Sequence, residues 1–99
     1  MCGIVGTVDS KDLRSFLLNG LKSLEYRGYD SAGIATITDS NFNLYRCVGR
    51  VETLEKKVPS NLPGFTGIGH TRWATHGEPL ERNCHPHVSY NKIFAIVHN

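Results

Sequence analysis

The second residue of the chain is a cysteine, and this position gives its thiol a possible chemical role. Cys2 is small enough for the initiator Met1 to be removed, which would leave a thiol and a free α-amine on one Cα. In model peptides an α-amine has a pKa of about 7.7–8.0 and a thiol one of about 8.5, so the amine could act as the base that activates the thiol. The alternative is that Cys2 is an ordinary small apolar residue of a strand, and its position alone favours that alternative.

A second group of polar side chains lies at positions 69–77, in the sequence GHTRWATHG. Arg72 carries the planar fork that grips a carboxylate through two hydrogen bonds. Thr75 and the neighbouring backbone amides could complete such a site, and Trp73 could pack beside it or move as a cover. The alternative is that Arg72 is a surface arginine and Trp73 a core tryptophan. This stretch alone supports a binding site and the alternative equally.

A third candidate is Asn99, which follows His98 and an apolar segment. A side-chain amide can donate a hydrogen bond to a developing oxyanion, and removing one such donor typically costs about 2.7–4 kcal/mol in the transition state. Taken alone, however, a single asparagine is far more often an ordinary polar residue.

Two other arrangements are weaker. Cys84, His85 and His87 offer three possible metal ligands, but no second cluster at zinc spacing accompanies them, so the sequence predicts no metal site. A papain-like catalytic pair, in which one of the five histidines activates the Cys2 thiol, is conceivable. That kind of nucleophile needs a helix N-terminus, whereas Cys2 is predicted to lie on a strand.

The elements that must position these residues follow from the apolar pattern. Apolar residues at helical spacing predict a helix from Leu13, with an N-cap at Asp9 or Ser10 and a stop at Arg27 and Gly28. Its apolar face is formed by Leu13, Phe16, Leu17, Leu21 and Leu24, and Gly20 on the same face predicts a close contact there. A second, shorter helix is predicted over 51–58. Strands are predicted over 2–8, 31–38, 42–48, 66–72 and 92–98, the last one buried, with a turn at 39–41 and a long polar loop over 73–91. About five strands and two helices indicate an α+β fold with largely antiparallel strands.

The composition excludes several classes of protein. A chain of 99 residues is enough for one small domain, and its 39% hydrophobic and 20% charged residues argue against disorder. A net charge of +2 gives no case for binding nucleic acid or a membrane surface. No apolar run approaches a membrane span, and the N-terminus does not read as a signal peptide. Three widely spaced cysteines argue against a disulfide framework, so a cytoplasmic location is expected.

Several motifs in a fixed order resemble one known family. They are MCGIVG at 1–6, LEYRGYDSAG at 24–33, HTRWATHGEP at 70–79, HPH at 85–87 and VHN at 97–99. Together they cover essentially the whole chain and resemble the class II (N-terminal nucleophile, Ntn) glutamine amidotransferases. Within that class, Tyr29 and Trp73 are more similar to the aminotransferases that act on a sugar phosphate than to the purine-biosynthetic members.

The resemblance implies a role for each candidate residue. Cys2 would attack the side-chain amide of L-glutamine and form a γ-glutamyl thioester, while its own α-amine relays the proton. Arg72 would hold the α-carboxylate of glutamine, with Thr75 and His76 lining the same pocket. The remaining roles are a gate at Trp73, an oxyanion-hole donor at Asn99 and a supporting residue, close to the nucleophile, at Arg27.

The resemblance also implies a fold and partners. Residues 1–99 are expected to be the N-terminal half of a glutaminase domain, built as a four-layer α/β/β/α sandwich of mostly antiparallel strands. The released ammonia would pass to an isomerase domain, absent here, that converts fructose 6-phosphate to glucosamine 6-phosphate. A homodimer and no cofactor are expected. The 99-residue chain by itself is expected to have little or no glutaminase activity.

Two alternatives to this function stay open. One is a different class II amidotransferase, acting in purine or asparagine synthesis. The other is a truncated, non-catalytic fragment whose unpaired apolar strands associate with another chain.

Overall fold

A four-stranded antiparallel sheet forms the centre of the molecule. The computed structural model describes residues 1–39 and 41–99. The spatial order of the strands is β1 (Gly3–Thr7), β4 (Thr66–Arg72), β2 (Ser31–Thr38) and β3 (Asn41–Val48). Every neighbouring pair is antiparallel. The sheet therefore has β1 and β3 at its edges and β4 and β2 in its middle.

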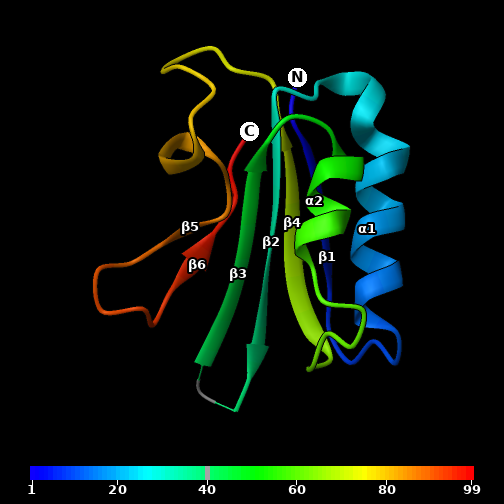
Figure 1. Ribbon diagram of the computed structural model, residues 1–99. Helices are drawn as coiled ribbons and strands as arrows, with labels where there is room; N and C mark the ends of the chain where they lie inside the picture. The colour runs from blue at the N-terminus through cyan, green and yellow to red at the C-terminus, as the bar shows by residue number, and fades with distance from the viewer. Residues whose placement is uncertain (40) are drawn as a thin grey trace.

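Helices and a small hairpin lie on opposite sides of this sheet (Figure 1). Helices α1 (Leu13–Leu24) and α2 (Val51–Lys57) cover one face, α1 over β1 and β4, and α2 over β2 and β3. The hairpin of β5 (His87–Val88) and β6 (Ala95–Ile96) lies on the other side. These layers are those of an α+β protein, as predicted. None of the helices in the described part of the chain is long and apolar enough to cross a membrane.

The core lies between the helices and the sheet. Helix α1 buries four leucines because their spacing places them on one face. Leu13, Leu17 and Leu21 belong to the predicted face, whereas Leu24 of that face is only half-buried. The buried cluster consists of Leu13, Leu17, Leu18, Leu21, Ala32, Ile34, Cys47, Val51, Leu54 and Val58. Phe16, which the apolar pattern also placed on the buried face, is instead 46% exposed, and Leu18 takes its place. Gly20 makes the predicted close contact, because a Cβ there would lie 2.8 Å from Val5 Cγ2.

The start of α1 differs from the prediction, whereas its end agrees. Asp12 caps the helix by accepting a hydrogen bond from the Ser15 amide, and neither Asp9 nor Ser10 does so. The amide of Ser10 donates to the Phe65 carbonyl at 2.8 Å, so Ser10 belongs to the turn that precedes the helix. After Leu24 one 3₁₀ turn, η1 (Glu25–Arg27), continues to Gly28, where the stop was predicted.

The other predicted elements agree closely with the structure up to residue 72. Strands β2 and β4 have the predicted bounds, and β3 begins one residue earlier than predicted, at Asn41. Helix α2 ends at Lys57, before Pro59, as predicted. Ser40 of the predicted turn lies outside the described residues.

The C-terminal part of the chain differs most from the prediction. The strand predicted over 92–98 is reduced to Ala95–Ile96, which pairs only with the two residues of β5. It is also not buried, since Ile93, Phe94 and Ile96 are 60–64% exposed. An apolar run becomes a buried strand only where another layer covers it, and the described residues provide no such layer here.

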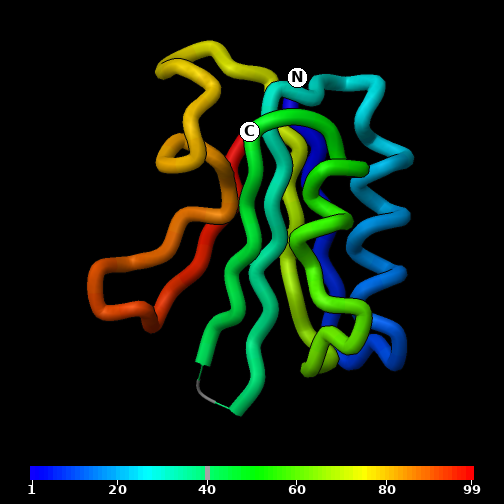
Figure 2. The backbone as a smooth tube through the Cα atoms, viewed as in Figure 1, coloured from blue at the N-terminus to red at the C-terminus, as the bar shows by residue number. Residues whose placement is uncertain are grey.

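The predicted loop over 73–91 has more structure than expected. It contains the 3₁₀ turn η2 (Glu81–Asn83) and strand β5, and it is fixed to the sheet through the buried Cys84 and Pro86. In Figure 2 this segment leaves the upper end of β4 and descends on the side of the sheet opposite the helices.

Candidate active site

A pocket lies where the two ends of the chain meet, at the upper end of the sheet in Figure 1. It has a volume of about 300 Å³. Its lining consists of Met1, Cys2, Arg72, Trp73, Thr75, His76, His85, His98 and Asn99. Six of the seven predicted site residues are therefore brought together. This follows from the antiparallel pairing of β1 with β4, which places the start of β1 beside the end of β4.

Cys2 is held from two sides in this pocket. The Trp73 amide donates to Cys2 Sγ over 3.4 Å, and the Cys2 amide donates to Asn99 Oδ1 over 3.1 Å. Because Oδ1 of Asn99 accepts this bond, its Nδ2 group is the part of the side chain that remains free to donate. A donor of this kind in the pocket that holds the thiol is what an oxyanion needs.

Arg27, the seventh predicted residue, lies outside the pocket lining and reaches it through Met1. The Met1 ammonium donates to the Arg27 carbonyl at 3.1 Å, and Arg27 Nη2 lies 3.1 Å from Met1 Sδ. Met1 is 67% exposed. While Met1 is attached, the nitrogen of Cys2 is an amide and cannot serve as a base. Removing Met1 would turn the same nitrogen, already facing Asn99, into the free amine.

Arg72 is 6% exposed, and the chain itself satisfies its guanidinium. Its Nη2 donates to the carbonyls of His76 and Gly77, and its Nη1 donates to that of Glu78 at 3.2 Å. Asp30 Oδ1 lies 3.8 Å from Nη1 and supplies the countercharge that a buried cation requires. A carboxylate that binds Arg72 through both Nη groups must therefore displace carbonyls of the 76–78 segment.

Trp73 lies next to Cys2 because Gly28 allows it. A Cβ at Gly28 would lie 2.6 Å from Trp73 Cβ and 3.2 Å from Trp73 Cα, so no larger residue fits there without moving the tryptophan. The indole itself is 54% exposed. Beyond it, Thr75 Oγ1 and His76 Nδ1 lie 3.3 Å apart at the exposed rim of the pocket.

Sequence reasoning did not assign a role to Asp30, which organises the arginine side of the site. The Ala74 amide donates to Asp30 Oδ2, and the Ser31 hydroxyl donates to Asp30 Oδ1 at 3.0 Å. The amide of Asp30 in turn donates to the Arg72 carbonyl at 3.0 Å. An aspartate at the start of a strand, within the motif YRGYDS, was the available signal.

Three histidines form a cluster beside the pocket. The rings of His70 and His85 stack with centroids 4.0 Å apart, and those of His85 and His87 are 4.3 Å apart. Burial, together with the positive charge that neighbouring histidines and Arg72 would present, lowers the pKa of His85 to about 4. Burial also lowers the pKa of His70 and of His87. The cluster is therefore neutral near pH 7.

The metal ligands considered for the 84–87 segment are used otherwise. Cys84 Sγ lies 3.5 Å from the Cys47 carbonyl and 3.4 Å from that of Leu80, and the histidine rings stack on each other. Across residues 1–39 and 41–99, no three or more His, Cys, Asp or Glu side chains are grouped so as to hold a metal ion.

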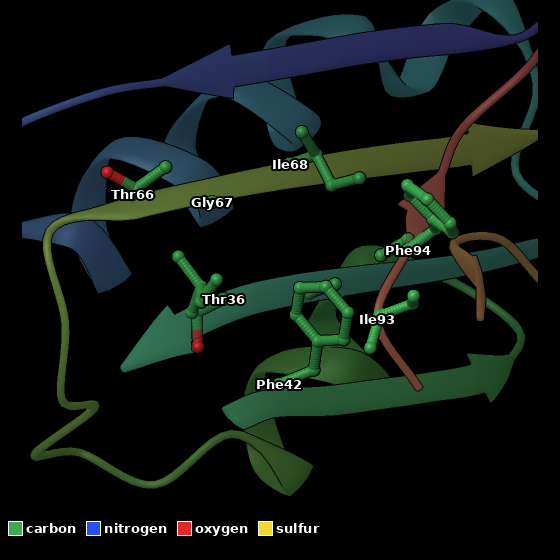
Figure 3. Close-up of a pocket in the computed structure, with 10 residues that line it drawn as sticks. Thr36, Phe42, Thr66, Gly67, Ile68, Ile93 and Phe94 are labelled. Carbon is green, nitrogen blue, oxygen red and sulfur yellow. The ribbon is translucent and has the colours of Figure 1, made fainter. Parts of the chain in front are cut away.

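A second pocket of about 310 Å³ lies under the β5–β6 hairpin (Figure 3). Phe42, Ile68, Ile93 and Phe94 line it together with small residues of β2 and β4. None of the described residues that line it is ionisable, so the hydroxyls of Thr36 and Thr66 have no base among the lining residues. We therefore place the candidate chemistry in the Cys2 pocket.

Comparisons with known proteins point to one kind of enzyme. Three similar proteins are each named glutamine–fructose-6-phosphate aminotransferase [isomerizing]. The one from Shewanella oneidensis is 56% identical to this chain, the one from Streptococcus agalactiae 54% and the one from Shouchella clausii 52%. Each alignment covers 100% of this chain and 16% of the relative. Over its whole length, the chain is therefore similar to one part of these aminotransferases. It spans about a sixth of the length of these relatives, and no family model matches it.

One solved structure shares the fold of this chain. The glutamine phosphoribosylpyrophosphate amidotransferase of B. subtilis matches with a TM-score of 0.61 at 26% identity. The match covers 91% of this chain and 19% of that one. The predicted Ntn architecture is thus confirmed for the layers that the chain contains.

Proposed function

We propose that this chain is the N-terminal part of the glutaminase domain of a glutamine–fructose-6-phosphate aminotransferase. The single observation that supports this most is the arrangement around Cys2, whose thiol lies beside the Trp73 amide and whose nitrogen lies 3.1 Å from Asn99 Oδ1. Identities of 52–56% over the whole chain favour this aminotransferase over other members of the class.

The proposed reaction begins once Met1 is removed. The thiol of Cys2 gives its proton to the α-amine of the same residue, and the sulfur adds to the side-chain carbonyl carbon of L-glutamine. Nδ2 of Asn99 donates to the oxyanion that forms. The protonated amine gives its proton to the leaving nitrogen, ammonia departs and a γ-glutamyl thioester remains. Water then hydrolyses the thioester, which restores the thiol and releases glutamate.

Substrate recognition would use the arginine side of the pocket. Arg72 pairs with the α-carboxylate of glutamine after the carbonyls of the 76–78 segment move away, and Thr75, His76 and Trp73 line the space around the substrate. None of the described residues that line the pocket is acidic, so none of them offers a countercharge to the α-ammonium group. We therefore expect the 99-residue chain alone to bind glutamine weakly and to turn it over little.

The activity of the whole protein is part of the same proposal. Ammonia from the glutaminase site passes to an isomerase domain, which uses it to convert fructose 6-phosphate to glucosamine 6-phosphate. We propose a cytoplasmic homodimer that acts without a cofactor and binds neither nucleic acid nor membranes. A phosphoribosylpyrophosphate amidotransferase is the second candidate, because such an enzyme matches this fold at 26% identity.

Ammonia release by the full-length protein tests the proposal. Full-length wild type should release ammonia from L-glutamine, and Cys2→Ala should abolish the release. Cys47→Ala is the matched control, because Cys47 is also a free cysteine but is buried in the core away from the pocket. Fructose 6-phosphate as acceptor supports the aminotransferase, and phosphoribosylpyrophosphate as acceptor supports the second candidate. Equal ammonia release by Cys2→Ala and wild type would exclude both.

A further inference from the structure

Two histidine rings hold the backbone of His98, the residue that precedes Asn99. His70 Nε2 lies 2.7 Å from the His98 carbonyl oxygen, and the His98 amide lies 3.3 Å from His85 Nδ1. Both backbone polar groups of a single exposed residue are therefore bound by side chains from elsewhere in the chain.

The chemistry of these two bonds fixes the form of each ring. A carbonyl oxygen only accepts, so His70 must carry its proton on Nε2. A backbone amide only donates, so His85 must keep Nδ1 unprotonated. The second nitrogen of His70, Nδ1, is buried without a hydrogen-bond partner. Protonating it would bury a charge, which reinforces the neutral form that the bond to His98 requires.

Both rings are anchored to the two middle strands of the sheet. His70 is fully buried on β4, in register with Gly33 on β2. A Cβ at Gly33 would lie 2.0 Å from the His85 carbonyl oxygen, so this glycine lets the 84–87 segment lie directly on the sheet. The rings stack with an angle of 16° between their planes. The nitrogens of the two rings therefore lie in separate, nearly parallel planes, which suits two separate hydrogen bonds and not one shared metal ion.

These contacts close a ring around the nucleophile. His70 binds the His98 carbonyl, and the next residue, Asn99, accepts a hydrogen bond from the Cys2 amide. Cys2 is followed by Gly3, which pairs with Thr71 on β4. Thr71 is the neighbour of His70, so the series of contacts returns to its start. Each contact thus restrains the next. Asn99 itself is exposed, so packing restrains its side chain little.

We propose that His70 and His85 are positioning residues that act through His98 to hold Asn99 against Cys2. They form a neutral clamp on the His98 backbone. The effect on catalysis rests on the proposed glutaminase function, whereas the clamp itself does not. The ring of His87 packs against that of His85 but, within the described part of the chain, makes no hydrogen bond to His98, so His87 is the matched control.

Paired substitutions in the full-length protein test the clamp. His70→Leu and His85→Leu remove the donor and the acceptor, whereas His70→Gln and His85→Asn keep one at nearly the same reach. Loss of one such hydrogen bond is expected to lower kcat for glutamine about tenfold while leaving KM within about twofold. The two conservative variants should recover most of kcat, and His87→Leu should match wild type.

NMR of the same proteins tests the clamp without relying on activity. In wild type we expect a coupling between the His98 amide nitrogen and His85 Nδ1 across the hydrogen bond, and slow exchange of the His98 amide proton. Slow exchange should persist in both His85→Asn and His87→Leu. The coupling should persist in His87→Leu but not in His85→Asn, whose acceptor is an oxygen. Both signals should vanish in His85→Leu. A His98 amide that exchanges at the solvent rate in wild type would overturn the proposal.

The kinetic result has its own contrary outcome. If wild type hydrolyses glutamine and His70→Leu and His85→Leu match His87→Leu in kcat, the clamp does not position the site and the proposal is wrong. If wild type shows the coupling but no hydrolysis, the proposed function fails and the clamp geometry is supported.

Discussion

Gly28→Ala should impair the Cys2 site without touching any predicted catalytic side chain. The added Cβ would lie 2.6 Å from Trp73 Cβ and 3.2 Å from Trp73 Cα, whereas ordinary carbon contacts are about 3.5–4.0 Å. Trp73 must therefore move by about 1 Å, and its amide, now 3.4 Å from Cys2 Sγ, moves with it. A misplacement of about 1 Å can reduce turnover about 100-fold. Overpacking should also lower the free energy of unfolding by about 1–3 kcal/mol.

Gly6→Ala is the matched control for this prediction. A Cβ at Gly6 would meet Ile68 Cγ2 at 3.7 Å, an ordinary contact, on a strand away from the pocket. Glutamine turnover and urea unfolding are to be measured for both variants in the full-length protein. A Gly28→Ala protein that turns over glutamine as fast as Gly6→Ala would refute the link from Gly28 through Trp73 to Cys2.

Three further predictions concern single residues. Protein that retains Met1 should release no ammonia from glutamine, because the nitrogen of Cys2 is then an amide. Intact-mass spectrometry of active and inactive fractions checks this, and an active fraction that retains Met1 would contradict it. The folded-state pKa of His85, about 4, lies below its unfolded value of 6.5, so the unfolded chain takes up the proton first. The contribution of His85 to the free energy of unfolding is complete above about pH 6.5 and falls by at most roughly 3 kcal/mol as the pH drops to 4. In urea unfolding, the free energy of unfolding of His85→Asn should therefore fall less over this pH range than that of wild type. Arg72→Lys should lose bonds to the 76–78 carbonyls and reduce the free energy of unfolding by about 1–3 kcal/mol, and unchanged stability would contradict the contacts described.

Much of the fold up to residue 72 could be predicted because local signals and tertiary packing agree there. The leucine pattern of α1 and the β-branched run of β2 each have one consistent solution. The N-cap was missed because Asp9, Ser10 and Asp12 are all residues that cap helices. Only the bond from Ser10 to the Phe65 carbonyl, a contact distant in sequence, assigns Ser10 to the turn and leaves Asp12 as the cap.

The C-terminal run could not be predicted from its own residues. Ile93 to Val97 has the composition of a buried strand, but burial depends on a covering layer and not on the run itself. In the structure Ile93 and Phe94 lie over the sheet beside Phe42, largely exposed (Figure 3).

The candidate site was predictable as a set of residues but not as a geometry. The ordered motifs around Cys2, Arg72 and Asn99 indicated the family, and the structure brings these three residues to one pocket. That Arg72 is occupied by carbonyls, and that His70 and His85 grip His98, depends on how β4 and the 73–91 segment fold back. No local pattern in the sequence carries that information.

A glutamyl group on Cys2 would show most directly that this thiol is the nucleophile. Full-length protein with Met1 removed would be mixed with L-glutamine, quenched in acid and examined by peptide mass spectrometry. We expect a glutamyl thioester on Cys2 that is absent from Cys2→Ala and appears on neither Cys47 nor Cys84. Treating the quenched peptide with hydroxylamine should remove it. Release of ammonia from glutamine with no adduct on Cys2 at any quench time, or an adduct on another cysteine, would contradict this expectation.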